Sequence, residues 1–352
     1  MSDLLQRLLA SRPWLLADGA TGTNLFAMGL QTGDPPEAWN IEHPDRIAAN
    51  YRSFVEAGAD IILTNSFGGN RYRLKLHGNE GRVAEFNEAA ARIAKEVVKQ
   101  SGREVVVAGS MGPTGEIYAP IGTLEPADAR AAFREQAEAL VRGGADVLWI
   151  ETISSHEEME AAVEGASGLG CPVVCTMSFE TNGRTMMGLA PGDVASTVAA
   201  LPHPPLGCGS NCGVGPSETV LSVLNMARGA TPEQVIVAKG NCGIPQWAAG
   251  HIVYDGTPEL MAAYARYAYA AGARIIGGCC GTTPEHLRAM RQALEACIEH
   301  PAEPTLEAIL ADLGDVSTGA KAQYGGDLSV AGGSASGAGA RRGRRARFHE
   351  RR

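Results

Sequence analysis

The chain has 352 residues, of which 45% are hydrophobic and 20% are charged, a composition typical of a globular protein with a large core. Its net charge of −9 is uneven: residues 317–352 carry one Lys and seven Arg against Asp327 and Glu350, a charge of +6, so residues 1–316 carry −15. The acidic body argues against a nucleic-acid binder, and no apolar run is long enough to span a membrane. Eight cysteines are too few for a disulfide framework, and the N-terminus has no basic, apolar leader, so we expect a cytoplasmic protein.

Eight short apolar segments recur at fairly regular intervals along the chain. Most are continuous and rich in Val, Ile and Leu, as expected of parallel strands that are buried on both faces. The sixth consists mostly of small residues and is assigned mainly from its place in the series. The predicted strands are residues 15–18, 61–65, 105–110, 147–151, 173–179, 206–211, 235–240 and 274–278.

Segments with helical periodicity lie between these strands. Proline at the first helical position marks several starts, and glycine follows the end of many of them. The clearest predicted helices are residues 45–57, 84–100, 126–142, 155–168, 217–228, 258–271 and 284–296. A repeated strand–helix order predicts a (β/α)₈ TIM barrel. The alternative is an open, doubly wound sheet, but no Gly-x-Gly-x-x-Gly motif follows the first strand.

The periodic pattern ends near Ser317. The segment that follows is rich in Gly, Ala and Ser, and it leads to an Arg-rich tip at residues 341–347. Such a composition cannot bury a core. We therefore predict a barrel over residues 1–316 and a disordered tail over residues 317–352.

Polar residues cluster at the predicted carboxyl ends of the strands, where the active site of such a barrel lies. Independent segments therefore bring polar groups to the same mouth, which is a stronger signal than any single motif. These residues are Asp18, Asn65, Ser66, Ser110, Glu151, Thr152, Ser178, Asn211, Cys212, Lys239, Asn241, Cys279 and Cys280.

Three of the cysteines form a candidate zinc site. Cys279 and Cys280 are adjacent and flanked by glycines, which permit the local twist that both sulfurs need to reach one ion. Cys212 follows the sixth strand and is also followed by glycine. Three thiolates without a fourth protein ligand indicate zinc with an open position, where a substrate thiol could bind and lose its proton. We interpret Cys171, Cys175, Cys208 and Cys297 as buried apolar residues, whereas Cys242 after the seventh strand stays open.

Two acidic residues, Asp18 and Glu151, follow the first and fourth strands. Carboxylates at the mouth of a barrel suit the ammonium group of a ligand. The turn at residues 19–23, Gly-Ala-Thr-Gly-Thr, offers backbone amides that could hold a carboxylate.

Several segments together carry a family resemblance. They are Asp-Gly-Ala-Thr-Gly-Thr at 18–23, Thr-Asn-Ser-Phe-Gly at 64–68, Gly-Pro-Thr-Gly-Glu at 112–116, Glu-Thr at 151–152, Asn-Cys at 211–212 and Gly-Gly-Cys-Cys-Gly-Thr-Thr-Pro-Glu-His at 277–286. From about residue 14 to 298 the chain resembles the homocysteine S-methyltransferase family, and within it most closely the bacterial betaine–homocysteine methyltransferases.

This resemblance implies a zinc-dependent barrel that transfers a methyl group from glycine betaine to L-homocysteine, giving methionine and dimethylglycine. It implies Zn²⁺ ligation and a catalytic role for Cys212, Cys279 and Cys280. It implies that Asp18 and Glu151 hold the homocysteine amino group, with Glu151 also counted as catalytic. The other expected substrate contacts are Gly19, Asn65, Ser66, Thr152 and Asn211.

The methyl donor is the most open part of this interpretation. The vertebrate betaine enzymes enclose the trimethylammonium group in an aromatic cage, and two corresponding positions here hold Gly68 and Thr152. Other aromatic residues on the mouth side could supply the ring faces that a quaternary ammonium favours, namely Trp39, Phe67, Tyr72, Tyr118, Phe179, Trp247 and Tyr254. Arg71, Arg73 or Arg184 could pair with the betaine carboxylate.

Two alternatives remain. One is a homocysteine methyltransferase that uses S-methylmethionine or another sulfonium donor, and the other is a non-catalytic, zinc-binding regulatory barrel. One barrel leaves no room for folate- and cobalamin-binding modules, which disfavours a complete vitamin-dependent synthase. We expect small-molecule substrates as partners and no nucleic acid or membrane, and a homo-oligomer stays open.

Overall fold

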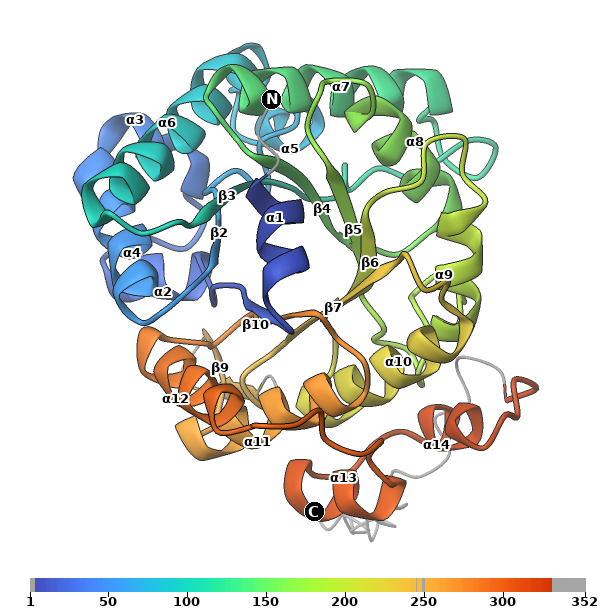
Figure 1. The fold of residues 1–352 in the computed structure, drawn as a ribbon. Helices are drawn as coiled ribbons and strands as arrows, with labels where there is room; N and C mark the ends of the chain where they lie inside the picture. The colour runs from blue at the N-terminus through green and yellow to red at the C-terminus, as the bar shows by residue number, and fades with distance from the viewer. Residues whose placement is uncertain (1–3, 245, 249–250, 331–352) are drawn as a thin grey trace, which may run out of the picture.

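The computed structural model describes residues 4–244, 246–248 and 251–330, and its eight parallel strands form a barrel surrounded by helices (Figure 1). The strand order is β1-β10-β7-β6-β5-β4-β3-β2, and a parallel bridge between Ala17 and Ile61 brings β1 beside β2. The predicted TIM barrel is therefore confirmed. The strands are β1 (Leu15–Leu16), β2 (Ile61–Leu63), β3 (Val106–Met111), β4 (Val147–Ile153), β5 (Val173–Met177), β6 (Gly207–Cys212), β7 (Val235–Gly240) and β10 (Ile275–Gly278).

Eight helices follow the strands and form the outer ring (Figure 1). They are α4 (Pro44–Glu56), α6 (Val83–Ser101), α7 (Pro126–Arg142), α8 (His156–Ala166), α9 (Pro191–Ala199), α10 (Pro216–Gly229), α11 (Pro258–Ala270) and α12 (Pro284–Glu295). The sequence predicts all of these except α9. That helix is short, and its Gly192, Thr197 and two valines have weak helix propensity.

Shorter elements fill the loops at the mouth of the barrel. After β1 and β2 come the helices α2 (Gly22–Ala27), α3 (Trp39–Glu42) and α5 (Arg71–Lys75), with the 3₁₀ turns η1 (Pro36–Ala38) and η2 (Glu80–Arg82). After β7, β8 (Gln246–Ala248) and β9 (His251–Val253) form an antiparallel hairpin. No helix in the described part of the chain is both long enough and apolar enough to cross a membrane.

The N-terminal helix α1 (Leu4–Ser11) closes one end of the barrel, and Figure 1 shows it lying across that end. Its Leu5 and Leu8 are buried in the cluster of side chains that fills the barrel interior. The strands contribute to this cluster with Leu15, Ala17, Ile61, Leu63, Val106, Ala108, Val147, Trp149, Val174, Val235, Val237 and Ile275. Because this end is filled, space for a ligand remains at the carboxyl ends of the strands.

The segment after residue 316 differs from the prediction. Helix α13 (Leu306–Leu313) is followed by α14 (Thr318–Tyr324), where we expected disorder. The α14 segment is tied to the loop after β5, because Gly319 N donates to Asn182 Oδ1 at 2.7 Å and Gln323 Nε2 donates to the Gly183 carbonyl at 2.9 Å. The prediction of a disordered tail is therefore wrong for residues 317–324, which form a capped helix whose small residues dock closely without giving a hydrophobic period. Residues 331–352 of the predicted tail lie outside the described residues.

Candidate metal and substrate site

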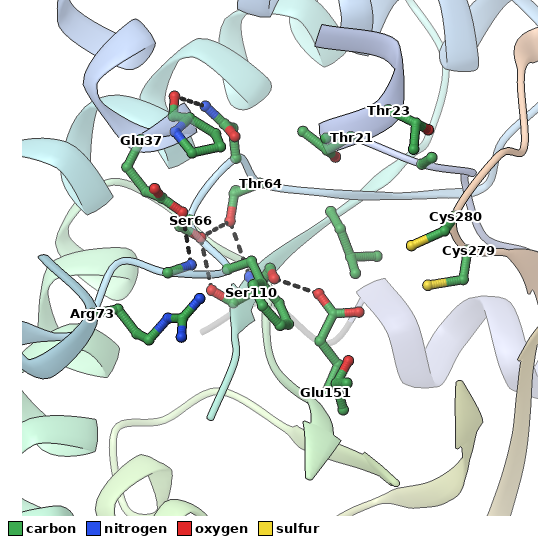
Figure 2. A pocket seen from close by; sticks show the side chains of 18 of the residues that line it. Thr21, Thr23, Glu37, Thr64, Ser66, Arg73, Ser110, Glu151, Cys279 and Cys280 are labelled. Carbon is green, nitrogen blue, oxygen red and sulfur yellow. Dashed lines mark hydrogen bonds between the residues drawn. The ribbon is translucent and has the colours of Figure 1, made fainter. Parts of the chain in front are cut away.

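A cavity of about 510 Å³ opens at the carboxyl ends of the barrel strands. In the view of Figure 2, Cys279 and Cys280 lie on one side of it, Glu37 and Arg73 lie on the opposite side, and Glu151 lies between them. Of the ten residues assigned from the sequence to zinc or homocysteine, eight line this cavity, namely Gly19, Asn65, Ser66, Glu151, Thr152, Cys212, Cys279 and Cys280. Asp18 and Asn211 do not line it.

The three predicted cysteines do come together. Their sulfur atoms all lie within 4.8 Å of one another, and the Sγ atoms of Cys212 and Cys280 are 3.9 Å apart. Sulfur ligands at about 2.3 Å from a tetrahedral ion are about 3.8 Å from each other, so this spacing fits one zinc ion. In the described part of the chain, no other group of three or more metal-ligating side chains lies this close together.

Backbone conformation turns the sulfur of Cys212 toward the other two. Cys212 ends β6 with a φ of 60°, a left-handed conformation that side chains rarely adopt, and Gly213 continues the turn with a φ of 73°. Strain of this kind collects where function requires a particular geometry. Gly281, with a φ of 80°, provides a similar turn directly after the Cys279–Cys280 pair.

Asn241 ties the two cysteine loops together. Its Oδ1 accepts a hydrogen bond from Cys280 N at 3.1 Å, and its Nδ2 donates to the Gly213 carbonyl at 2.8 Å. Asn241 is buried, so both bonds are shielded from water. The sequence placed Asn241 at the mouth but gave no indication of this role, because its partners are far away in the chain.

The charges of the three thiols explain why a cation belongs among them. Hydrogen bonds to Cys279 and Cys280 raise the pKa of Cys212, and hydrogen bonds from Cys212 and Cys279 lower the pKa of Cys280. One ionised sulfur therefore suppresses ionisation of its neighbours, since like charges this close repel. A divalent, thiophilic cation removes that conflict. Cys242, whose role the sequence leaves open, lies outside this cluster, and its thiol donates to the Gly256 carbonyl at 3.4 Å.

Glu151 is the carboxylate that faces the cavity. It lies in β4, is 8% exposed, and its Oε1 accepts a hydrogen bond from Ser110 Oγ at 2.5 Å. Burial, followed by the negative charge of Cys279, raises the pKa of Glu151 to about 7, while Lys239 and Ser110 oppose the rise. A bound ammonium group would stabilise the ionised form.

Asp18 forms an ion pair with a buried lysine. Lys239 Nζ lies 2.8 Å from Asp18 Oδ1, both side chains are 2% exposed, and Leu63 N donates to Asp18 Oδ2 at 2.7 Å. Burial raises the pKa of Asp18, and Lys239 opposes this; burial alone would lower the pKa of Lys239, but Asp18 and Glu151 raise it. The short contact and the second hydrogen bond favour the ionised pair. Lys239 itself lines the cavity, whereas Asp18 does not.

Asn211 serves as a clamp on Thr152. Thr152 has a φ of 64°, and its N and Oγ1 are each 2.8 Å from the side-chain amide of Asn211. Thr176 Oγ1 donates to the same Asn211 oxygen at 2.7 Å. Asn211 therefore holds the wall of the cavity in shape.

The remaining predicted contacts also form part of the wall. Ser66 Oγ donates to the Ser110 carbonyl at 2.7 Å, and Asn65 Nδ2 donates to the Pro36 carbonyl at 2.7 Å. Gly19 is required for close packing, because a Cβ there would lie 2.6 Å from the Thr282 carbonyl oxygen.

Only some of the candidate aromatic residues lie at the cavity. Phe67 lines the cavity, and so does Phe26, which the sequence reasoning missed because α2 was not predicted. Trp39 and Phe179 are buried in the core, Tyr72 and Tyr118 pack against it, and Tyr254 hydrogen-bonds to Cys280. The side chain of Trp247 lies outside the described part.

The three candidate arginines differ in whether they already have a partner. Arg71 is paired with Glu135 at 2.8 Å, and Arg184 donates to the Gly188 carbonyl at 3.0 Å and the Leu328 carbonyl at 2.6 Å. Arg73 lines the cavity, and its guanidinium makes no ion pair or hydrogen bond with another described residue.

The sequence matches the model of the family described as homocysteine S-methyltransferase over residues 15–294. The chain belongs to this family. The methionine synthase of Mycobacterium tuberculosis is 33% identical over 319 residues, which are 85% of this chain and 26% of that protein. The methionine synthase of Mycobacterium leprae is 31% identical over 84% of this chain and 25% of that protein. The chain thus spans about a quarter of the length of these relatives.

Among solved structures, the fold is similar to the homocysteine methyltransferase MmuM from Escherichia coli in its metallated form. The two are 25% identical with a TM-score of 0.68, and the match covers 82% of this chain and 99% of that one.

Proposed function

We propose that this chain is a zinc-dependent homocysteine S-methyltransferase that uses glycine betaine and produces methionine and dimethylglycine. The observation that carries the proposal is that the sulfurs of Cys212, Cys279 and Cys280 open onto the same cavity as the buried carboxylate of Glu151.

The three cysteines would hold Zn²⁺, and zinc would supply a binding position for the homocysteine sulfur and lower the pKa of its thiol. The chain's own residues orient the substrate around that sulfur. Glu151 binds the ammonium group, and the cavity-lining turn that contains Thr21 and Thr23 offers backbone amides to the carboxylate. Asp18 acts indirectly, through the lysine that it holds.

The methyl donor approaches from the side of Phe26 and Phe67, whose ring faces attract the methylated cation. A bond forms between the homocysteine sulfur and a methyl carbon as the bond from that carbon to nitrogen breaks. The electron pair stays on the departing amine, which leaves neutral and needs no acid. The protein contributes alignment and exclusion of water.

A sulfonium donor is the second candidate. Phe26 and Phe67 are 48% and 37% exposed, so they enclose a trimethylammonium group on one side rather than caging it. A compact sulfonium would need less enclosure, and a neutral sulfide leaves more readily than an amine.

Methionine formation from homocysteine, measured by mass spectrometry with the zinc-loaded protein, tests the proposal. Betaine, S-methylmethionine and dimethylsulfoniopropionate are compared at equal concentration, and Cys212→Ser serves as the metal-free control. We expect methionine with betaine and none with Cys212→Ser. Turnover with the sulfonium compounds only would refute betaine as the donor. Zinc binding without turnover for any donor would favour the regulatory barrel.

A further inference from the structure

Two opposite charges lie on the side of the cavity away from the cysteines. Figure 2 shows Glu37 and Arg73 there, from the segment after α2 and from α5, respectively. Both side chains line the cavity, and they are not within ion-pair distance of each other. Neither belongs to the metal cluster or to the part of the site assigned above to homocysteine.

Glu37 presents a buried carboxylate with spare bonding capacity. It is 5% exposed, and its carboxylate accepts hydrogen bonds from Gly68 N, at 2.7 Å to Oε1, and from its own backbone N–H. A Cβ at position 68 would lie 3.0 Å from Oε1, so Gly68 gives the carboxylate room. Burial raises the pKa of Glu37, and the hydrogen bonds from its own backbone N–H and from Gly68 N, followed by the charge of Arg73, oppose that rise. A cation beside Glu37 would therefore favour its ionised form.

The space beside Gly68, where a larger residue would place its side chain, holds the Glu37 carboxylate. A negative charge attracts a methylated cation as a ring face does, and it does so more strongly in a partly desolvated cavity.

Arg73 is a half-buried cation without an anion. Asn70 fixes the start of α5, since its Oδ1 accepts hydrogen bonds from Tyr72 N and Arg73 N, both at 3.1 Å. The guanidinium extends toward Gly115, where a Cβ would lie 3.1 Å from Nη1. Arg71, two residues earlier on the same helix, is satisfied by Glu135. A half-buried guanidinium without such a partner suits a carboxylate ligand.

We propose that Glu37 and Arg73 select the methyl donor as a dipolar ion, with Arg73 binding its carboxylate and Glu37 facing its methylated cation. This inference rests on the proposed function and deepens it, because it names the donor class as onium carboxylates. A donor that lacks the carboxylate keeps the attraction to Glu37 and loses the contact to Arg73. The two charges therefore discriminate against simple onium ions, because these lack the carboxylate that Arg73 would bind.

The test compares two donor types in matched variants of the zinc-loaded protein with homocysteine. Betaine carries a carboxylate, and trimethylsulfonium does not. Arg73→Gln should lower kcat/KM for betaine by about 10- to 100-fold, the size of a lost hydrogen-bonded charge contact. It should leave kcat/KM for trimethylsulfonium and the KM for homocysteine nearly unchanged. Arg73→Lys should recover part of the betaine activity, because it restores the charge without the two-pronged geometry.

Glu37→Gln should lower kcat/KM for both donors, and the control Arg71→Gln for neither. An equal loss for the two donors in Arg73→Gln, or no loss with betaine, would overturn the role of Arg73. Calorimetric binding of betaine and of tetramethylammonium to the zinc- and homocysteine-loaded protein gives the same comparison without turnover. A wild-type protein that forms no methionine from any donor refutes the proposed function. If that protein still binds betaine through Arg73, the dipolar subsite stands.

Discussion

Replacing Lys239 by Met should destabilise the barrel through the carboxylate that it leaves behind. Lys239 and Asp18 are each 2% exposed and 2.8 Å apart, so the substitution strands a buried anion that keeps only the hydrogen bond from Leu63 N. Removing one partner of a buried ion pair costs about 3–5 kcal/mol. We therefore expect a loss of that size in the free energy of unfolding at pH 8.

The sign of the pH dependence follows from the same carboxylate. Without Lys239, the folded-state pKa of Asp18 rises further above the ordinary 3.8, because burial is then opposed only by the Leu63 hydrogen bond and weaker contributions. A carboxyl group with a raised folded-state pKa weakens the fold as pH rises through the interval between the two pKa values. The loss in the free energy of unfolding caused by Lys239→Met should thus be smaller at pH 5.5 than at pH 8.

Urea unfolding followed by circular dichroism measures the effect, with each variant compared with the wild type at the same pH. Asp18→Asn combined with Lys239→Met should recover part of the loss, since the anion is gone. Arg82→Met, which removes an exposed partner of Glu85, is the control and should change little. A loss below about 1 kcal/mol at pH 8, or an equal loss at both pH values, would refute the buried ion pair.

Three further predictions concern the substrate, the C-terminal segment and the metal. Glu151→Gln should raise the homocysteine KM by roughly 10- to 100-fold. In the wild type that KM should rise as pH falls below about 7, where Glu151 takes up a proton, and the Gln variant should lack this step. Ending the chain after residue 330 should leave methionine formation unchanged, whereas ending it after residue 316 removes α14 and should lower Tm measurably, which thermal unfolding will decide. Cys212→Ser should lose zinc measured by mass spectrometry, and Cys171→Ser, whose sulfur lies outside the cluster, should retain it.

The sequence predicted the barrel and the cysteine cluster because both are encoded locally. Parallel strands buried on both faces give continuous apolar runs, and the Cys279–Cys280 pair is visible in neighbouring positions. Cys212 could be added because the carboxyl ends of all strands meet at one mouth.

The features that the sequence did not predict depend on contacts between distant segments. Lys239 neutralises Asp18 across 221 positions, a pairing that no local pattern indicates. The hydrogen bonds between Asn211 and Thr152 likewise join segments 59 positions apart. Helix α14 is stabilised by docking to the loop after β5, so its short stretch of small residues resembled a disordered tail.

X-ray absorption at the zinc edge, recorded with and without L-homocysteine, decides whether the three cysteines hold zinc with a position open to the substrate thiol. We expect one zinc per chain with three sulfur ligands at about 2.3 Å in the free protein. A fourth sulfur ligand should appear when L-homocysteine is added, and no such change should occur in Cys212→Ser. Fewer than three sulfur ligands in the free protein, or an unchanged sulfur count with homocysteine bound, would refute the zinc site.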